Sequence, residues 1–100
     1  MNTNRRIFKY PLYPHSQTIK VPAGAIVLSV INQRDNLVLY ASVPEDNDPE
    51  VVKDLEINIV GTGHAFSFDT VNDFKFLGTV STFDGDLIWH VFYKDNGYFG

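Results

Sequence analysis

Residues 25–43, AIVLSVINQRDNLVLYASV, decide the fold class. Apolar residues recur at every second position on both sides of a polar tetrapeptide at 33–36, and a period of two is the pattern of a β-strand. Residues 25–32 place Ile26, Leu28 and Val30 on one face. Residues 37–43 place Leu37, Leu39, Ala41 and Val43 on one face. The segment therefore predicts an antiparallel hairpin, with its turn at 33–36.

A second hairpin is predicted near the C-terminus, where strands 75–83 and 87–93 flank Asp84-Gly85-Asp86. An Asp-Gly pair supplies the positive φ that a tight reversal requires. In 87–93 both faces are apolar: Leu87, Trp89, Val91 and Tyr93 share one face, and Ile88, His90 and Phe92 share the other. A strand of this type is expected at the centre of a sheet, or covered on both sides.

The rest of the chain adds shorter alternating segments at 6–10, 18–21 and 55–60. Pro11 and Pro14 are expected to end the first of these. Asp48-Pro49-Glu50 resembles a helix start, so one or two helical turns through Lys53 compete with a loop, and 65–73 is left unassigned. We predict one mainly-β domain over residues 1–100, a compact antiparallel sandwich or small barrel of six to seven strands with little helix. Residues 1–5 and 95–100 are expected to be flexible.

Composition excludes several classes of function. The 100 residues contain no cysteine, so disulfides, thiolate nucleophiles and cysteine-ligated metals are absent. No apolar run approaches the length of a membrane span, and no secretory signal is recognised, so we expect no membrane contact and a cytoplasmic location. Residues 1–20 hold four cationic side chains and no acid, whereas residues 21–100 hold four cations and all twelve acids, a net charge of −8. An acidic body of this kind disfavours duplex DNA.

The run Gly61-Thr62-Gly63-His64 is the most site-like feature of the sequence. Two glycines allow a tight turn whose N–H groups could converge on an anion, although a simple strand-ending turn is an equally physical interpretation. Together with His90, Trp89 and Arg6 it forms the candidate ligand site, for a small anion such as a nucleotide. His90 itself is expected to be half-buried and hydrogen-bonded. No motif nominates a catalytic residue, a cofactor or a metal ligand, and His64 with His90 matches no metal-binding spacing.

The second candidate site is the acidic segment at 44–54, between the predicted strands 37–43 and 55–60, which is a candidate surface for a protein partner. It comprises Glu45, Asp46, Asp48, Glu50 and Asp54. A solvated loop is the simpler interpretation of such a charge run.

Several short motifs occur together in a fixed order: IFKYPL at 7–12, VPAGA at 21–25, GTGH at 61–64, FLGTV at 76–80 and WHVF at 89–92. As a set they resemble a family of small, mostly uncharacterised proteins encoded by bacteriophages and prophages. The resemblance implies a phage origin and a location in the cytoplasm of the bacterial host, and it brings no catalytic residues.

These observations favour a non-enzymatic binding module: a phage accessory protein, with a role against host defence as one version, that acts by occupying a host protein. Apolar groups on both faces of several strands also allow a homodimer. The alternatives are a protein that sequesters a small anionic ligand and, with less support, a small hydrolase that uses His64 and His90.

Overall fold

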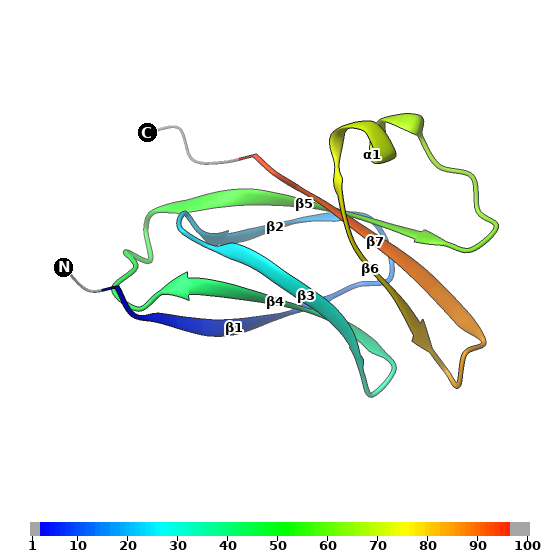
Figure 1. Ribbon diagram of the computed structural model, residues 1–100, viewed down its shortest axis with the longest axis horizontal. Coiled ribbons are helices and arrows are strands. Elements are labelled where there is room, and N and C mark those ends of the chain that lie inside the picture. The colour runs from blue at the N-terminus through cyan, green and yellow to red at the C-terminus, as the bar shows by residue number, and fades with distance from the viewer. Residues whose placement is uncertain (1–2, 97–100) are drawn as a thin grey trace.

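Two antiparallel β-sheets make up most of the protein (Figure 1). The computed structural model describes residues 3–96. The three-stranded sheet has the order β1 (Arg5–Leu12), β4 (Asn36–Pro44), β3 (Ile26–Gln33). The four-stranded sheet has the order β2 (Gln17–Pro22), β5 (Val52–Gly61), β7 (Leu87–Asp95), β6 (Lys75–Thr82). The short helix α1 (Phe68–Asp73) lies between β5 and β6. The predicted fold, a compact antiparallel sandwich or small barrel of six to seven strands with little helix, is confirmed, with seven strands in two sheets.

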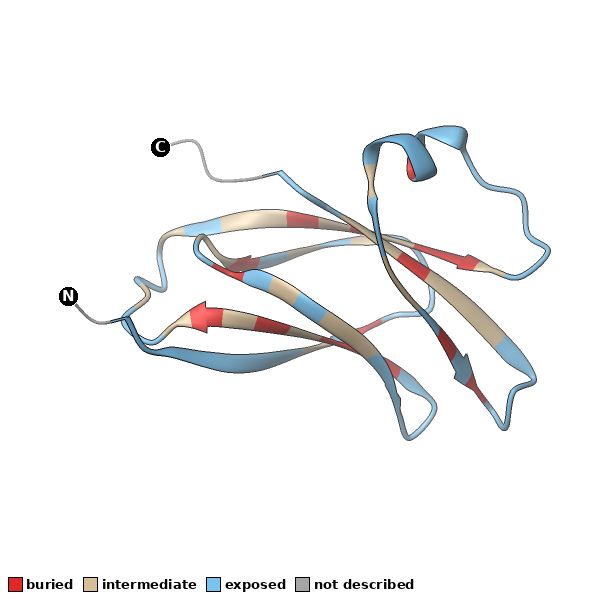
Figure 2. Ribbon diagram, viewed as in Figure 1, coloured by how far each residue is buried: buried red, intermediate tan, exposed pale blue. Residues whose placement is uncertain are grey.

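The core lies between the inner faces of the two sheets, where the alternating apolar residues meet. Leu39 and Val43 of β4, Leu55 and Ile57 of β5, and Val91 of β7 are almost completely buried. Figure 2 shows this burial on strands of both sheets, while the segment that leads from β5 into α1 is exposed. Strand β7, which has apolar residues on both faces, lies inside its sheet between β5 and β6, as the pattern of 87–93 predicted.

Strands β3 and β6 are the neighbouring edges of the two sheets, and side chains join them. Asn32 Nδ2 donates to the carbonyl of Ser81 at 2.9 Å, and Phe83 N donates to Asp35 Oδ1 at 2.8 Å. The β3–β4 turn has positive φ at both Arg34 (55°) and Asp35 (64°), as in the tight turns that match strand twist. The tips of the β3–β4 and β6–β7 hairpins are thus joined at one end of the sandwich.

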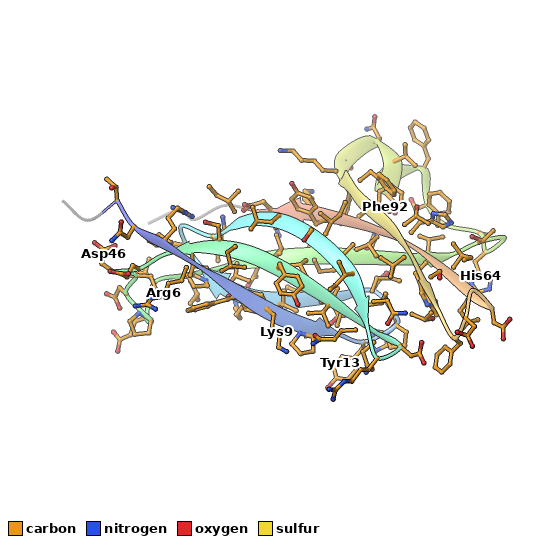
Figure 3. All side chains as sticks on the ribbon, turned by 60° about the horizontal axis from the view of Figure 1, so that its bottom comes forward. Arg6, Lys9, Tyr13, Asp46, His64 and Phe92 are labelled. Carbon is orange, nitrogen blue, oxygen red and sulfur yellow. The ribbon has the colours of Figure 1, made fainter. Side chains whose placement is uncertain are left out.

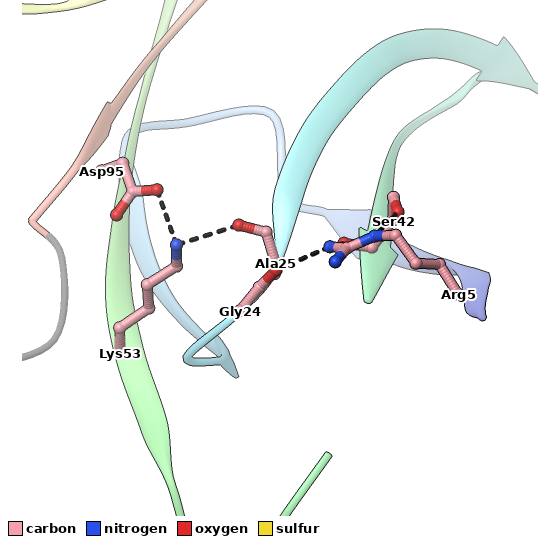
Figure 4. Close-up of polar contacts among 6 residues, drawn as sticks. All are labelled: Arg5, Gly24, Ala25, Ser42, Lys53 and Asp95. Atoms are coloured by element: carbon pink, nitrogen blue, oxygen red, sulfur yellow. Dashed lines mark hydrogen bonds and ion pairs between the residues drawn. The ribbon is translucent and has the colours of Figure 1, made fainter. Parts of the chain in front are cut away.

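At the opposite end, the turn between β2 and β3 is fastened to both sheets (Figure 4). From the four-stranded sheet, Lys53 Nζ donates to the carbonyl of Ala25 at 2.9 Å and to Asp95 Oδ2 at 2.7 Å. From the three-stranded sheet, Arg5 Nη2 donates to the carbonyls of Gly24 at 2.7 Å and Ser42 at 3.0 Å. Arg5 and Asp95 belong to β1 and β7, so ordered strand extends into both segments that the sequence suggested were flexible. Residues 1, 2 and 97–100 of those segments lie outside the described part of the chain.

Two local expectations need correction. The register of β3 shifts between Val27 and Ser29, so a bulge at Leu28 places Ile26 and Val30 on opposite faces. Strand β1 continues through Pro11, which an edge strand tolerates.

The structure also decides two segments that the sequence left open, residues 48–53 and 65–73. Residues 48–51 form a turn in which Asp48 Oδ1 accepts from Glu50 N at 2.9 Å, and β5 begins at Val52. The predicted helical turns at Asp48–Lys53 are therefore absent. The helix lies instead at Phe68–Asp73, capped by Ser67, whose hydroxyl accepts from Asp69 N. Within residues 3–96 no helix is long and apolar enough to cross a membrane.

Candidate functional site

The Gly61–His64 run forms a tight turn at the end of β5. His64 N donates to the carbonyl of Gly61 at 3.0 Å, and Gly63 has φ of +88°, a value that glycine adopts without a steric penalty. Thr62 N donates to the carbonyl of Ile88 at 3.1 Å. The amides of Thr62 and His64 therefore serve the fold itself and are not free to bind an anion.

His90 lies on the outer face of β7, with hydrogen bonds at both ring nitrogens. Nε2 is 2.7 Å from the Thr62 hydroxyl, and Nδ1 is 3.0 Å from the Thr79 hydroxyl. A neutral imidazole has one donor and one acceptor nitrogen, and a threonine hydroxyl can play either role. His90 is thus a half-buried, hydrogen-bonded residue, as expected, and its ring is fixed against the turn.

Three phenylalanine rings lie beside His90 and the Gly61–His64 turn, on the same face of the four-stranded sheet. The centroid of Phe92 lies 5.4 Å from that of Phe76, with an interplanar angle of 65°, and 6.3 Å from that of Phe66. Phe76 and Phe92 are register partners in β6 and β7, and Phe66 comes from the segment between β5 and α1. Figure 3 shows Phe92 and His64 at the same end of the molecule.

The rings and the turn line an open pocket of about 290 Å³, which we call the aromatic pocket. It is lined by Val60, Gly61, Thr62, Gly63, His64, Phe66, Phe76, His90 and Phe92. None of these residues is a lysine, arginine, aspartate or glutamate. The pocket consequently suits an uncharged, apolar group, because burying an ion without a counter-charge is costly.

The sequence nominated the turn and His90 but did not nominate the three phenylalanines as site residues. The signal was present in the strand alternation: Phe92 shares a face with His90, and its partner Phe76 follows from the antiparallel pairing around Asp84-Gly85-Asp86. The position of Phe66 could not be derived in this way, because it lies outside the strands.

Trp89 lies on the inner face of β7 and not in the aromatic pocket. Its Nε1 donates to the Thr82 hydroxyl at 3.0 Å, and its strand partner is Gly61. It reaches the turn only from the other side, where it lines an adjoining pocket with Gly61, Thr62 and His64.

Arg6 is not brought to the site. It lies at the opposite end of the molecule from His64 (Figure 3), and its Nη2 is 3.5 Å from Glu45 Oε2. One copy of the chain therefore cannot combine Arg6 with the Gly61–His64 turn.

The acidic segment occupies the same end as Arg6, as Asp46 shows in Figure 3. Several of its charges already have partners: Glu45 pairs with Arg6, Asp54 pairs with Lys20, and Asp48 closes the turn before β5. Asp46 and Glu50 are exposed. The two candidate sites of the sequence thus lie at opposite ends of the protein.

Metal-dependent chemistry would require a cluster of side chains that can bind a metal ion. Among residues 3–96, no three histidine, aspartate or glutamate side chains form a group that could hold a metal ion. Both ring nitrogens of His90 are engaged by threonines, so His90 has no free nitrogen directed at a substrate in this arrangement.

The sequence of the chain was compared with curated proteins, solved structures and protein-family models. No curated protein and no solved structure is significantly similar to the chain. The family model described as a domain of unknown function, DUF7352, matches residues 3–98. Since this match covers nearly the whole sequence, the chain belongs to the DUF7352 family.

Proposed function

We propose that the protein is a non-enzymatic binding module that acts by occupying another protein through the aromatic pocket and its rim. The observation that supports this proposal is the exposure of apolar rings around the pocket: Phe66 and Phe76 are 49% and 58% exposed. Contiguous exposed apolar surface on a soluble domain marks an interaction site, because covering it removes apolar area from water.

A protein partner fits this surface better than a small ligand does. Helix α1, which follows Phe66 in the chain, carries two further exposed apolar side chains, Phe68 and Val71, which are 75% and 55% exposed. A molecule small enough for the roughly 290 Å³ pocket would leave these two side chains in water. A partner surface that inserts one anchor side chain into the pocket would cover them as well, which is the usual arrangement of a binding hot spot and its surroundings.

The resemblance to phage proteins suggests which partner to seek. We propose that the partner is a protein of a bacterial host, that the encounter takes place in the host cytoplasm, and that interference with host defence is the specific role to test. A second copy of the chain is the competing partner, and it is distinguished by the mass of the complex.

The alternative functions have less support. A small anionic ligand would meet no lysine or arginine in the lining of the aromatic pocket. Two of the turn amides, those of Thr62 and His64, already donate hydrogen bonds within the fold. Arg6 lies at the far end of the molecule. A hydrolase that used His64 and His90 together would need a free nitrogen on both imidazoles, and His90 has both of its ring nitrogens bonded to threonine hydroxyls.

The test compares two substitutions at equally exposed apolar positions. Phe76 in β6 is 58% exposed and Ile26 in β3 is 57% exposed, and both strands are sheet edges. Each variant, Phe76→Ser and Ile26→Ser, is immobilised and incubated with host lysate, after its thermal unfolding has been compared with that of the wild type.

We expect Phe76→Ser to lower the recovery of a stoichiometric partner by about tenfold or more, the scale of one lost anchor side chain. Ile26→Ser is expected to keep recovery near the wild-type level. Equal recovery by both variants, or a loss restricted to Ile26→Ser, would contradict the proposal, since neither would place the contact at the aromatic pocket.

A further inference from the structure

We propose that β1 is a docking edge for an extended segment of an acidic protein partner, which joins the three-stranded sheet as a fourth strand. The segment carries an acid, an apolar residue and a second acid at every second position. This inference goes beyond the proposed function, because β1 belongs to the three-stranded sheet whereas the aromatic pocket lies on the four-stranded sheet. The observations that carry it are the free backbone groups of β1 and the charges beside them.

Strand β1 is an open edge. Within residues 3–96 it pairs with β4 on one side and with no strand on the other, and residues 5–9 are all exposed (Figure 2). The edges β3 and β6, in contrast, lie beside each other and are joined through Asn32 and Ser81. The remaining edge, β2, has six residues against eight in β1, and its one charged residue, Lys20, already pairs with Asp54. Strand β1 is therefore the edge most accessible to a further strand.

The backbone groups that β1 leaves free belong to every second residue. Glu45 N donates to the carbonyl of Asn4 at 3.0 Å, so Asn4 faces β4. Hydrogen-bonded pairs alternate along an antiparallel ladder, and the β1–β4 register has no shift. The backbone groups of Arg5, Ile7 and Lys9 therefore point away from β4, toward solvent. The next residue of this series is a proline, whose missing N–H costs the ladder no hydrogen bond.

Charge complementarity identifies the kind of segment that fits. The strands of the three-stranded sheet contain no aspartate or glutamate, whereas β1 contains three cations. Two of these, Arg5 and Lys9, lie on the same face as Ile7, two residues to either side of it. Arg5 donates to backbone carbonyls and to the Ser42 hydroxyl, and Lys9 donates to Gln33 Oε1, so these bonds supply no negative charge.

An added strand would meet these three side chains in register. Acids opposite Arg5 and Lys9 would provide the missing counter-charges, and an apolar residue opposite Ile7 would cover a side chain that is 66% exposed. The main chain of the segment would bond to the free groups of β1. This is the usual division of roles when a peptide adds to a sheet edge, where the main chain gives affinity and alternate side chains give specificity.

A second copy of the chain fits this edge less well. If β1 paired antiparallel with itself about Ile7, Arg5 of each copy would lie opposite Lys9 of the other. Like charges directly opposite each other destabilise a pair of strands, and cations on an edge strand are a common protection against self-pairing. The charges of β1 therefore oppose another β1 and favour an acidic segment.

The probe is a seven-residue peptide with blocked ends, in which two glutamates flank a central valine at every second position and threonines fill the other places. The control peptide has lysines in place of the glutamates. Binding to the full chain is followed by amide NMR titration, and amide hydrogen exchange identifies the backbone groups that become bonded.

In the free protein, we expect the amides of Phe8 and Tyr10 to be protected and those of Ile7 and Lys9 to exchange rapidly. With the glutamate peptide at about ten times its dissociation constant, exchange at Ile7 and Lys9 should slow by about tenfold. The lysine peptide should bind about tenfold more weakly, since two favourable cross-strand pairs become repulsive.

Lys9→Glu reverses one of the two charges of the edge. Lys75→Glu is the matched control, because Lys75 is an exposed lysine on β6, an edge strand of the other sheet. We expect Lys9→Glu to weaken binding of the glutamate peptide by about fivefold and Lys75→Glu to leave it unchanged.

A protein that does not bind the glutamate peptide would overturn the inference, as would equal affinities for the two peptides or equal effects of the two variants. Binding that leaves exchange at Ile7 and Lys9 unaltered would also overturn it, since the peptide would then adhere through charge without forming a strand. The proposed function is tested at Phe76 on the other sheet, so either claim can fail while the other stands.

Discussion

Lys53 is a charged residue whose side chain is only 8% exposed, and its two hydrogen bonds compensate for its removal from water. Replacing Asp95 with asparagine takes away the carboxylate that forms an ion pair with this ammonium at 2.7 Å. We expect Asp95→Asn to lower the free energy of unfolding by about 1–3 kcal/mol, since a poorly solvated ammonium loses its counter-ion.

The matched control is the exposed pair between Lys20 and Asp54, whose side chains are 70% and 43% exposed. Exposed ion pairs contribute about 1 kcal/mol or less, so Asp54→Asn should have a smaller effect. Urea unfolding of the three proteins measures both changes. Equal losses in the two variants would show that burial of Lys53 does not govern the energetics of its pair.

Tyr10 provides a pH dependence at the residue scale. Its side chain packs against the core from β1, and burial raises the pKa of its hydroxyl above the ordinary value of 10.0. The unfolded chain therefore ionises first, and the stability that Tyr10 contributes, which is complete below about pH 10, is lost as the pH rises above that value. We expect Tyr10→Phe to flatten the decline in unfolding free energy between about pH 9.5 and 11. An identical decline in wild type and variant would assign it to other groups.

At the scale of the elements, the alternation of apolar residues predicted every strand, because a half-buried sheet imposes a period of two on its sequence. It could not predict the bulge at Leu28. The residues around Leu28 are apolar on both sides of the bulge, so the sequence does not show that the later residues of β3 change to the other face of the sheet. It also could not decide where the short helix lies. Asp48 and Ser67 are both good N-caps, and Ser67 is followed by Thr70, which is buried and bonded to Asn58 of β5.

Helix α1 depends on this packing and on its cap. Thr70 is 4% exposed and its hydroxyl accepts from Asn58 Nδ2 at 2.9 Å, which fastens the helix to β5. Ser67→Ala removes the cap, for which we expect a local loss of about 1 kcal/mol. The amide of Phe74, which donates to the carbonyl of Thr70, should then exchange its hydrogen about fivefold faster, while the amides of β5 keep their protection.

The control for the helix is Ser16→Ala. The Ser16 hydroxyl also accepts from a backbone amide, that of Ile59, but it belongs to the β1–β2 connection and not to α1. Exchange at Phe74 that is unaltered in Ser67→Ala, or equally accelerated in Ser16→Ala, would show that the Ser67 cap does not hold the helix.

At the scale of the whole molecule, the sandwich separates two chemically different ends. Arg6 and the acidic segment lie at one end, and the Gly61–His64 turn with the aromatic pocket lies at the other (Figure 3). The sequence could nominate the turn, because two glycines and a histidine within four residues are distinctive. It could not place Arg6 far from the turn or Trp89 behind it, because these positions depend on strand order and on which face of β7 points inward.

The central claim is that a partner protein contacts the aromatic pocket. The most direct measurement is photo-crosslinking in the host from a p-benzoylphenylalanine placed at position 76, compared with the same residue at position 26, followed by mass determination of the products. We predict a discrete adduct with a host protein from position 76 and none from position 26. Adducts from both positions alike, from position 26 alone, or with the mass of two copies of this chain would contradict the claim.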